Sequence, residues 1–299
     1  YSRCELCRNE GYMEQHFNTP AEVIDNNMKA GEGKAHLPLG KMILLGIMAG
    51  AFIALGGATS STAAHAIDNV GLARFVAGII FPVGLMIIVF VGGELFTGNC
   101  LIVMDVVGKK VTWFECIRNL IVVYFSNLIG ALIIDTLIYF SGNLDYTGGL
   151  LGAYAIKVAV GKVGISPLKG ITSGILCNIL VCIAILMAAA ATDIVGKIWA
   201  IFFPIMAFVV GGFEHCVANM FYIPAGMMAA QNPAYVAKAQ EAYGLTAEQI
   251  QGLTVLHSLN NFIPVTIGNI LGGMVFVGIP CYFIYKKKWQ KWHEESKNA

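Results

Sequence analysis

Residues 91–99 read Val-Gly-Gly-Glu-Leu-Phe-Thr-Gly-Asn, and residues 210–219 read Val-Gly-Gly-Phe-Glu-His-Cys-Val-Ala-Asn. Each phrase falls where an unbroken membrane helix would be expected. Backbone without helical hydrogen bonds is tolerated at membrane depth only where protein buries it or where it lines a water-filled cavity. The two phrases therefore predict two broken helices and favour a transport pathway.

The composition is that of a membrane protein. Hydrophobic residues make up 57% of the 299 residues, charged residues 12%, and the mean hydropathy is +0.70. A soluble domain carries about 25% charged residues. The formal net charge of +1 and the lack of a basic cluster outside the tails argue against nucleic acid as a partner.

Six stretches meet or nearly meet the length of about 20 apolar residues that a spanning helix needs. They cover residues 39–58, 73–107, 119–140, 170–191, 195–229 and 261–285, with breaks at 94–99 and 213–219. We expect an all-α integral membrane protein with six transmembrane helices, the second and fifth broken. Residues 1–36 and 287–299 are the predicted tails, and residues 37–286 the predicted channel domain.

The two halves of the chain contain an internal repeat. Lys41, Gly46 and Gly50 match Lys169, Gly174 and Asn178 at an offset of 128, and Asn119, Asn127 and Gly130 match Asn261, Asn269 and Gly272 at an offset of 142. The repeats cover about residues 37–141 and 165–286. Three spans in each unit force the second copy into the membrane upside down, which gives an inverted repeat.

The Lys and Arg residues predict the orientation. Fourteen of the 19 fall in the two tails and in the loops on the same side. Because these residues concentrate on the cytoplasmic side, both termini are predicted to be cytoplasmic. Residues 20–30 form either an amphipathic helix on that face or a solvated tail.

Ionisable residues within spanning segments are expensive to bury and are therefore functional candidates. Glu94 and Glu214 occupy equivalent positions beside the two breaks, each followed five residues later by an asparagine, Asn99 or Asn219. We expect these residues to be structural, with each carboxylate accepting hydrogen bonds from freed backbone N–H groups. Asp135 has no repeat partner and is left unassigned.

His215 lies inside the second break. A lone histidine in an apolar stretch is more often a satisfied core residue, but this position favours a pore residue. Imidazole titrates near neutral pH, so it can offer a hydrogen bond or a proton to an anion in transit. Thr97, in the matching break, offers a hydroxyl donor. The candidate constrictions, which could also be simple packing residues, are Phe81, Leu85, Leu95, Phe96 and Phe208.

Two other classes of protein remain as alternatives. A neutral-solute pore would explain the broken helices, although the paired Asn-Pro-Ala motifs of aquaporins are absent from the sequence. A membrane redox enzyme would need metal or haem ligands, and six of the eight cysteines lie in or near apolar segments without metal-site spacing. Cys4 and Cys7 form only half a zinc site. We expect no cofactor, no metal site and no catalytic residues.

Four ordered motifs resemble the formate/nitrite transporter family: Glu-Leu-Phe-Thr-Gly-Asn at 94–99, Gly-Ile-Leu-Cys-Asn-Ile-Leu-Val-Cys at 174–182, Gly-Phe-Glu-His-Cys-Val-Ala-Asn-Met at 212–220 and Ile-Pro-Val-Thr-Ile-Gly-Asn at 263–269. This resemblance implies a plasma-membrane homopentamer of pores with an aquaporin-like fold. The pores would pass formate, nitrite or hydrosulfide, and overall similarity leans toward the hydrosulfide branch.

The resemblance also assigns pore residues. It implies that His215 is the family's central histidine, Thr97 its loop threonine, and Lys162 and Asn178 its lysine and helix-four asparagine. One implied constriction is lined by Leu85, Leu95, Phe96 and Val181, and the other by Phe81 and Phe208.

Overall fold

The computed structural model describes residues 17–286, and this part of the chain is almost entirely helical. The helices are α1 (Pro20–Ala35), α2 (Leu39–Ala64), α3 (Val70–Ile80), α4 (Val83–Val91), α5 (Phe96–Asn99), α6 (Val103–Val107), α7 (Trp113–Phe140), α8 (Tyr146–Val163), α9 (Pro167–Ala190), α10 (Ile194–Gly211), α11 (Cys216–Ala229), α12 (Pro233–Tyr243), α13 (Ala247–Gln251), α14 (Val255–Leu271) and α15 (Ile279–Tyr285). Short 3-10 turns, η2 (Cys100–Ile102) and η3 (Asn143–Asp145), and a π-helical segment, η4 (Gly272–Gly278), connect some of them.

The prediction of six transmembrane helices is confirmed. Six helical segments of the described chain are long and apolar enough to span a bilayer: Leu39–Ala64, Val70–Val91, Trp113–Phe140, Pro167–Ala190, Ile194–Gly211 and Val255–Tyr285. Two shorter apolar helices, Phe96–Val107 and Cys216–Ala229, follow the second and fifth spans. They are the second halves of the two broken helices.

The breaks are shorter than the sequence predicted and begin earlier. The first covers residues 92–95 and the second residues 212–215. Gly92 and Gly212 have φ angles of +103° and +68°, values that favour glycine and end the preceding helix. Helical structure resumes at Phe96 and Cys216, so the expected breaks at 94–99 and 213–219 were too long. Thr97, Asn99 and Asn219 lie in half-helices, not in the breaks.

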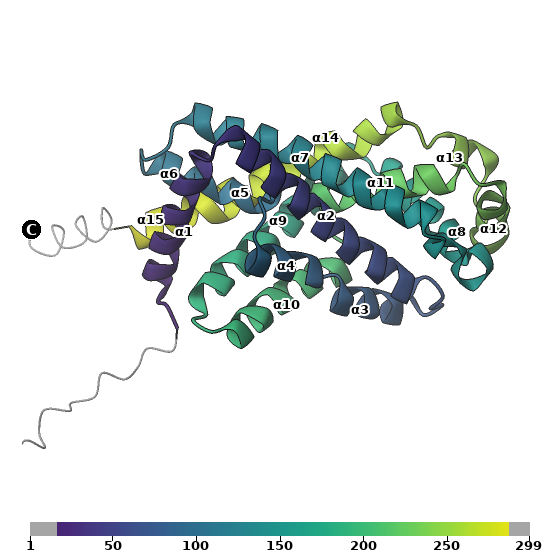
Figure 1. Ribbon diagram of the computed structural model, residues 1–299, viewed down its shortest axis with the longest axis horizontal. Helices are drawn as coiled ribbons and strands as arrows, with labels where there is room; N and C mark the ends of the chain where they lie inside the picture. The colour runs from purple at the N-terminus through teal and green to yellow at the C-terminus, as the bar shows by residue number, and fades with distance from the viewer. Residues whose placement is uncertain (1–16, 287–299) are drawn as a thin grey trace, which may run out of the picture.

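The two halves of the chain use the same packing. In the first half α2 crosses α7 closely, because a Cβ on Gly130 would lie 2.0 Å from the carbonyl oxygen of Ile47. In the second half α9 crosses α14 in the same way, at Gly268 and the carbonyl of Ile171. Figure 1 places α1 at one end of the long axis and α8 at the other. This arrangement agrees with an inverted repeat.

Helices α1, α8 and α12 were not counted among the spans. The structure extends the candidate amphipathic helix at residues 20–30 to Ala35, and it buries the face of α1 that carries Val23, Ile24 and Met28. Helix α8 packs on α11, and α12 packs on α8 through the buried Tyr235. At the offset of 128, residues 148–163 of α8 correspond to α1, so each duplicated unit begins with a helix that precedes the predicted repeat boundary.

Candidate functional site

A polar network holds the second break in place. Lys162 donates to both carboxylate oxygens of Glu214, at 3.0 and 3.1 Å. Asn219 and Asn261 donate to the same carboxylate, at 2.7 and 3.2 Å. Asn269 accepts from the backbone N–H of residue 216 at 2.9 Å and donates to the carbonyl of Glu214 at 3.0 Å. Side chains of α8, α11 and α14 thus surround the Glu214 carboxylate, and Asn269 satisfies backbone groups on both sides of His215.

An equivalent network holds the first break. Lys34 lies 3.5 Å from Glu94 and donates to Asn99 at 3.0 Å. Asn99 donates to Glu94 at 2.7 Å and to Asn119 at 2.8 Å. Asn127 accepts from the N–H of residue 96 at 3.0 Å. Every member has its counterpart in the other half, which shows that the duplication covers the chemistry of the breaks as well as the helices.

This pairing corrects the expected role of the two glutamates. Neither carboxylate accepts a hydrogen bond from a freed backbone N–H group; lysine and asparagine side chains supply the donors. The Glu94 N–H donates to the carbonyl of Leu45, and the Glu214 N–H donates to the hydroxyl of Ser173. The sequence reasoning missed Lys34, although it lies 128 residues before Lys162, the offset that already related Gly46 to Gly174.

His215, in the second break, meets Thr97, in the half-helix that follows the first break. The Nε2 atom of His215 lies 3.0 Å from the Thr97 hydroxyl, and its Nδ1 atom accepts from the backbone N–H of Ala218 at 2.9 Å. Both side chains are buried, at 3% and 0% exposure. His215 is the residue that caps α11, whereas Leu95, at the same place in the first break, has no capping side chain.

Asn178 joins the halves at the same point. Its side-chain amide donates to the carbonyl of Thr97 at 3.2 Å and to the carbonyl of Asn269 at 2.6 Å. Cys182, one turn further along α9, also lies within 3.6 Å of the Thr97 carbonyl. The backbone that carries the Thr97 hydroxyl is therefore held from the opposite half of the molecule.

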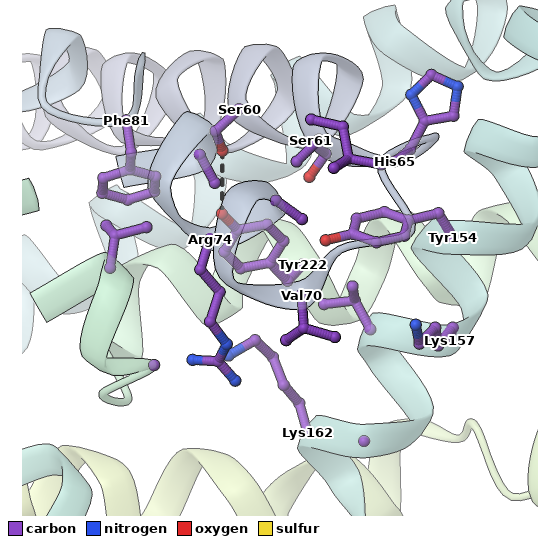
Figure 2. Close-up of a pocket in the computed structure, with 18 of the residues that line it drawn as sticks. Ser60, Ser61, His65, Val70, Arg74, Phe81, Tyr154, Lys157, Lys162 and Tyr222 are labelled. Atoms are coloured by element: carbon purple, nitrogen blue, oxygen red, sulfur yellow. Dashed lines mark hydrogen bonds between the residues drawn. The ribbon is translucent and has the colours of Figure 1, made fainter. Parts of the chain in front are cut away.

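A cavity of about 620 Å³ opens toward this centre from the α8 side. Phe81 and Phe208 lie in its wall with ring centroids 5.5 Å apart, edge to face, and Phe208 stacks on His215 at 5.8 Å. Figure 2 shows the cavity walls, including Arg74, Lys157 and Lys162 together with Tyr154 and Tyr222.

The other four constriction candidates, Leu85, Leu95, Phe96 and Val181, are at most 3% exposed and do not line this cavity. They belong to the same buried cluster as Phe81 and Phe208. The structure therefore separates the six apolar residues into a pair on the cavity wall and a set of four buried elsewhere in the core.

Some sequence candidates stay outside the site. Asp135 is buried in α7 without a hydrogen-bond partner among the described residues, and the same holds for the carboxylate of Asp105 in α6. Within residues 17–286 no group of three or more metal-ligating side chains comes together. Cys4 and Cys7 lie outside the described residues.

Together the six spans, the two mirrored breaks and the buried polar centre below a cavity are features of a membrane transport protein. The family model described as "Formate/nitrite transporter" matches residues 21–283. The chain belongs to the formate/nitrite transporter family. It is not an enzyme, as the sequence predicted.

The similarity to relatives covers nearly the whole chain. It is 36% identical to the "Probable formate transporter" of Methanothermobacter thermautotrophicus, covering 92% of this chain and all of that one. It is 35% identical to the "Formate channel FocA" of Escherichia coli strain K12, covering 90% of this chain and 95% of that one. A solved structure described as "Pentameric formate channel with formate bound" has a TM-score of 0.74 at 35% identity, covering 83% of this chain and 97% of that one.

Proposed function

We propose that each protomer forms a pore for small monovalent weak-acid anions, with formate as the first substrate and nitrite and hydrosulfide as further ones. The two relatives described above are named for formate, and neither name favours the hydrosulfide branch that overall resemblance suggested. The likeness to a pentameric formate channel supports a homopentamer in the lipid bilayer. The observation that carries the proposal is the buried pair of His215 and Thr97 between two broken helices.

The proposed path begins in the cavity and narrows at Phe81 and Phe208. It continues past His215 and Thr97 and ends between Leu85, Leu95, Phe96 and Val181. An anion loses most of its hydration at such apolar rings, which costs several kcal/mol unless donors replace the lost water. The polar centre lies beside Phe208, where those donors are needed.

The hydrogen bonds of His215 define its chemical role. Because Nδ1 accepts the Ala218 N–H, the ring proton belongs on Nε2 and the imidazole is neutral. Nε2–H then donates to the Thr97 oxygen, which leaves the Thr97 hydroxyl proton free for an anion. A proton on Nδ1 would displace the Ala218 N–H from its acceptor. We therefore assign hydrogen-bond donation, and not a stored proton, to His215.

Lys162 does not act as an unpaired positive charge that attracts anions. Glu214 balances it at 3.0 Å, and its side chain is 16% exposed. It contributes by holding the second break in place through Glu214, and it lines the cavity. Lys34 holds the first break in place through Glu94 and does not line the cavity. The excess of Lys and Arg on the side of the tails supports cytoplasmic termini in a plasma-membrane protein, with the cavity on the outer face.

The test is flux into proteoliposomes of formate, nitrite and hydrosulfide, with chloride and glycerol as controls, across a pH series. The informative variant is His215→Asn, because asparagine still caps a helix but no longer reaches Thr97. We expect wild-type protein to pass weak-acid anions and exclude glycerol, and His215→Asn to lose anion flux while remaining folded. Glycerol flux without anion flux would make the protein a neutral-solute pore. Unchanged anion flux in His215→Asn would refute the role of the histidine.

A further inference from the structure

Two cations of the cavity, Arg74 and Lys157, have no function in the path described above, and Arg74 contacts the backbone at the second break. Arg74 projects from α3 into the cavity. Its Nη1 atom lies 3.3 Å from the carbonyl oxygen of Val210. A Cβ on Gly212 would lie 2.1 Å from the same atom, so the guanidinium rests directly on backbone that carries no side chain.

Among the described residues, no carboxylate pairs with Arg74. The ion pairs found within residues 17–286 leave Arg74 out, whereas Lys162 pairs with Glu214. A guanidinium has five N–H donors in one plane, and the contact with Val210 uses one of them. The remaining donors are available to a ligand in the cavity.

Arg74 and Lys162 reach the same segment of chain from different helices. Arg74 contacts Val210 and Gly212, and Lys162 contacts Glu214, so both cations lie along the break between α10 and α11. Figure 2 shows the two side chains extending toward each other within the cavity. An anion between them would lie in the cavity whose wall also carries Phe81 and Phe208.

Within residues 17–286, the second break has an arginine on its glycine and the first break does not. Gly92 holds the place of Gly212 in the first break, with a similar positive φ, but no heavy atom lies within 4 Å of the position of its Cβ. The two breaks share their lysine, glutamate and asparagines, and they differ in this arginine.

We propose that Arg74, next to the Lys162–Glu214 pair, forms a vestibule site that binds planar oxyanions before they reach the constriction. A guanidinium matches two acceptor oxygens held on one atom, as in a carboxylate or nitrite, through two parallel hydrogen bonds. Hydrosulfide has a single acceptor atom and gains only the charge. The site rests on the proposed anion pathway and narrows its substrate class to oxyanions such as formate and nitrite.

The experiment compares Arg74→Gln, Arg74→Lys and Lys238→Gln by the concentration dependence of formate uptake into proteoliposomes. Lys238→Gln removes one positive charge from α12, where Lys238 pairs with Glu241 and does not line the cavity. For Arg74→Gln we expect roughly a tenfold rise in the half-saturating formate concentration, equal to about 1.4 kcal/mol. Arg74→Lys keeps the charge but loses the paired N–H donors of the guanidinium, and it should raise the half-saturating formate concentration about threefold.

Maximal flux at saturating formate should stay at the wild-type level in all three variants, because the constriction is unchanged. If the Arg74→Gln variant does not assemble, Arg74→Lys alone tests the site. Wild-type half-saturation in Arg74→Lys, or equal shifts in Arg74→Gln and Lys238→Gln, would overturn the site. Absence of formate flux in the wild-type protein would instead overturn the proposed function.

Discussion

Replacing Lys162 with methionine should destabilise the protein far more than the same change at Lys34. Lys162 and Glu214 have side chains only 16% and 11% exposed, with a 3.0 Å contact. Removing one partner of a buried pair costs about 3–5 kcal/mol. Because Asn219 and Asn261 still donate to Glu214, we expect the lower end of that range, about 3 kcal/mol.

The mirrored pair supplies the matched control. The side chain of Lys34 is 35% exposed and lies 3.5 Å from Glu94, so water can replace much of its interaction. Exposed pairs contribute about 1 kcal/mol or less. At about 2–4 °C per kcal/mol for a chain of this size, Lys162→Met should lower the melting temperature by roughly 6–12 °C and Lys34→Met by a few degrees.

Thermal unfolding of the detergent-solubilised protein measures both shifts in melting temperature. A double-mutant cycle isolates the interaction energy between Lys162 and Glu214. Lys162→Met combined with Glu214→Gln should recover most of the loss, because the uncompensated carboxylate is gone. Equal losses at Lys34 and Lys162, or a double variant as unstable as the sum of its single changes, would refute the reasoning.

Two further outcomes are expected. Gly130→Ala should destabilise the protein by about 1–3 kcal/mol, because the added Cβ would meet the Ile47 carbonyl at the α2–α7 crossing. The control Gly33→Ala should be neutral or stabilising, because no heavy atom lies within 4 Å of the added Cβ. The melting temperatures of the two variants measure the difference, and equal losses would contradict the packing argument. Hydrogen bonds to the Glu32 carbonyl and then to the Glu115 carboxylate raise the pKa of His36. The stabilisation from protonated His36 is therefore fully present below about pH 6.5 and is lost as the pH rises through the raised pKa. Hydrogen-exchange protection of residues 20–35, corrected for intrinsic rates, should fall from pH 6 to pH 8.5 in the wild-type protein and show no such fall in His36→Ala; a wild-type protection that does not change with pH would count against the contact.

The spans could be predicted from the sequence because apolar length alone identifies them. The limits of the breaks could not, since they depend on where the backbone turns. Gly92 and Gly212 end their helices through positive φ angles, and neighbouring glycines looked equally suitable in the sequence. Helices α8 and α12 were missed because neither is a long apolar stretch, and only the packing of α8 on α11 and of α12 on α8 reveals their place.

The sequence predicted most residues of the site but only part of the hydrogen bonds between them. The repeat positions of Glu94 and Glu214 indicated a structural role, but their partners come from helices distant in sequence. Asn119 and Asn261 were noticed only as repeat markers, although each accepts a hydrogen bond from the asparagine of a broken helix. Arg74 has no sequence signal, because its contact is with backbone atoms of Val210.

The two polar networks have a consequence for biosynthesis. Lys34, Glu94, Asn99, Asn119 and Asn127 all precede residue 141, and the members of the other network all follow residue 146. Each half thus satisfies the polar groups of its own break. Since domains generally fold in order during synthesis, the first half can reach a hydrogen-bonded state in the bilayer before the ribosome has made the second. The pore then arises when two completed units dock at Thr97 and His215.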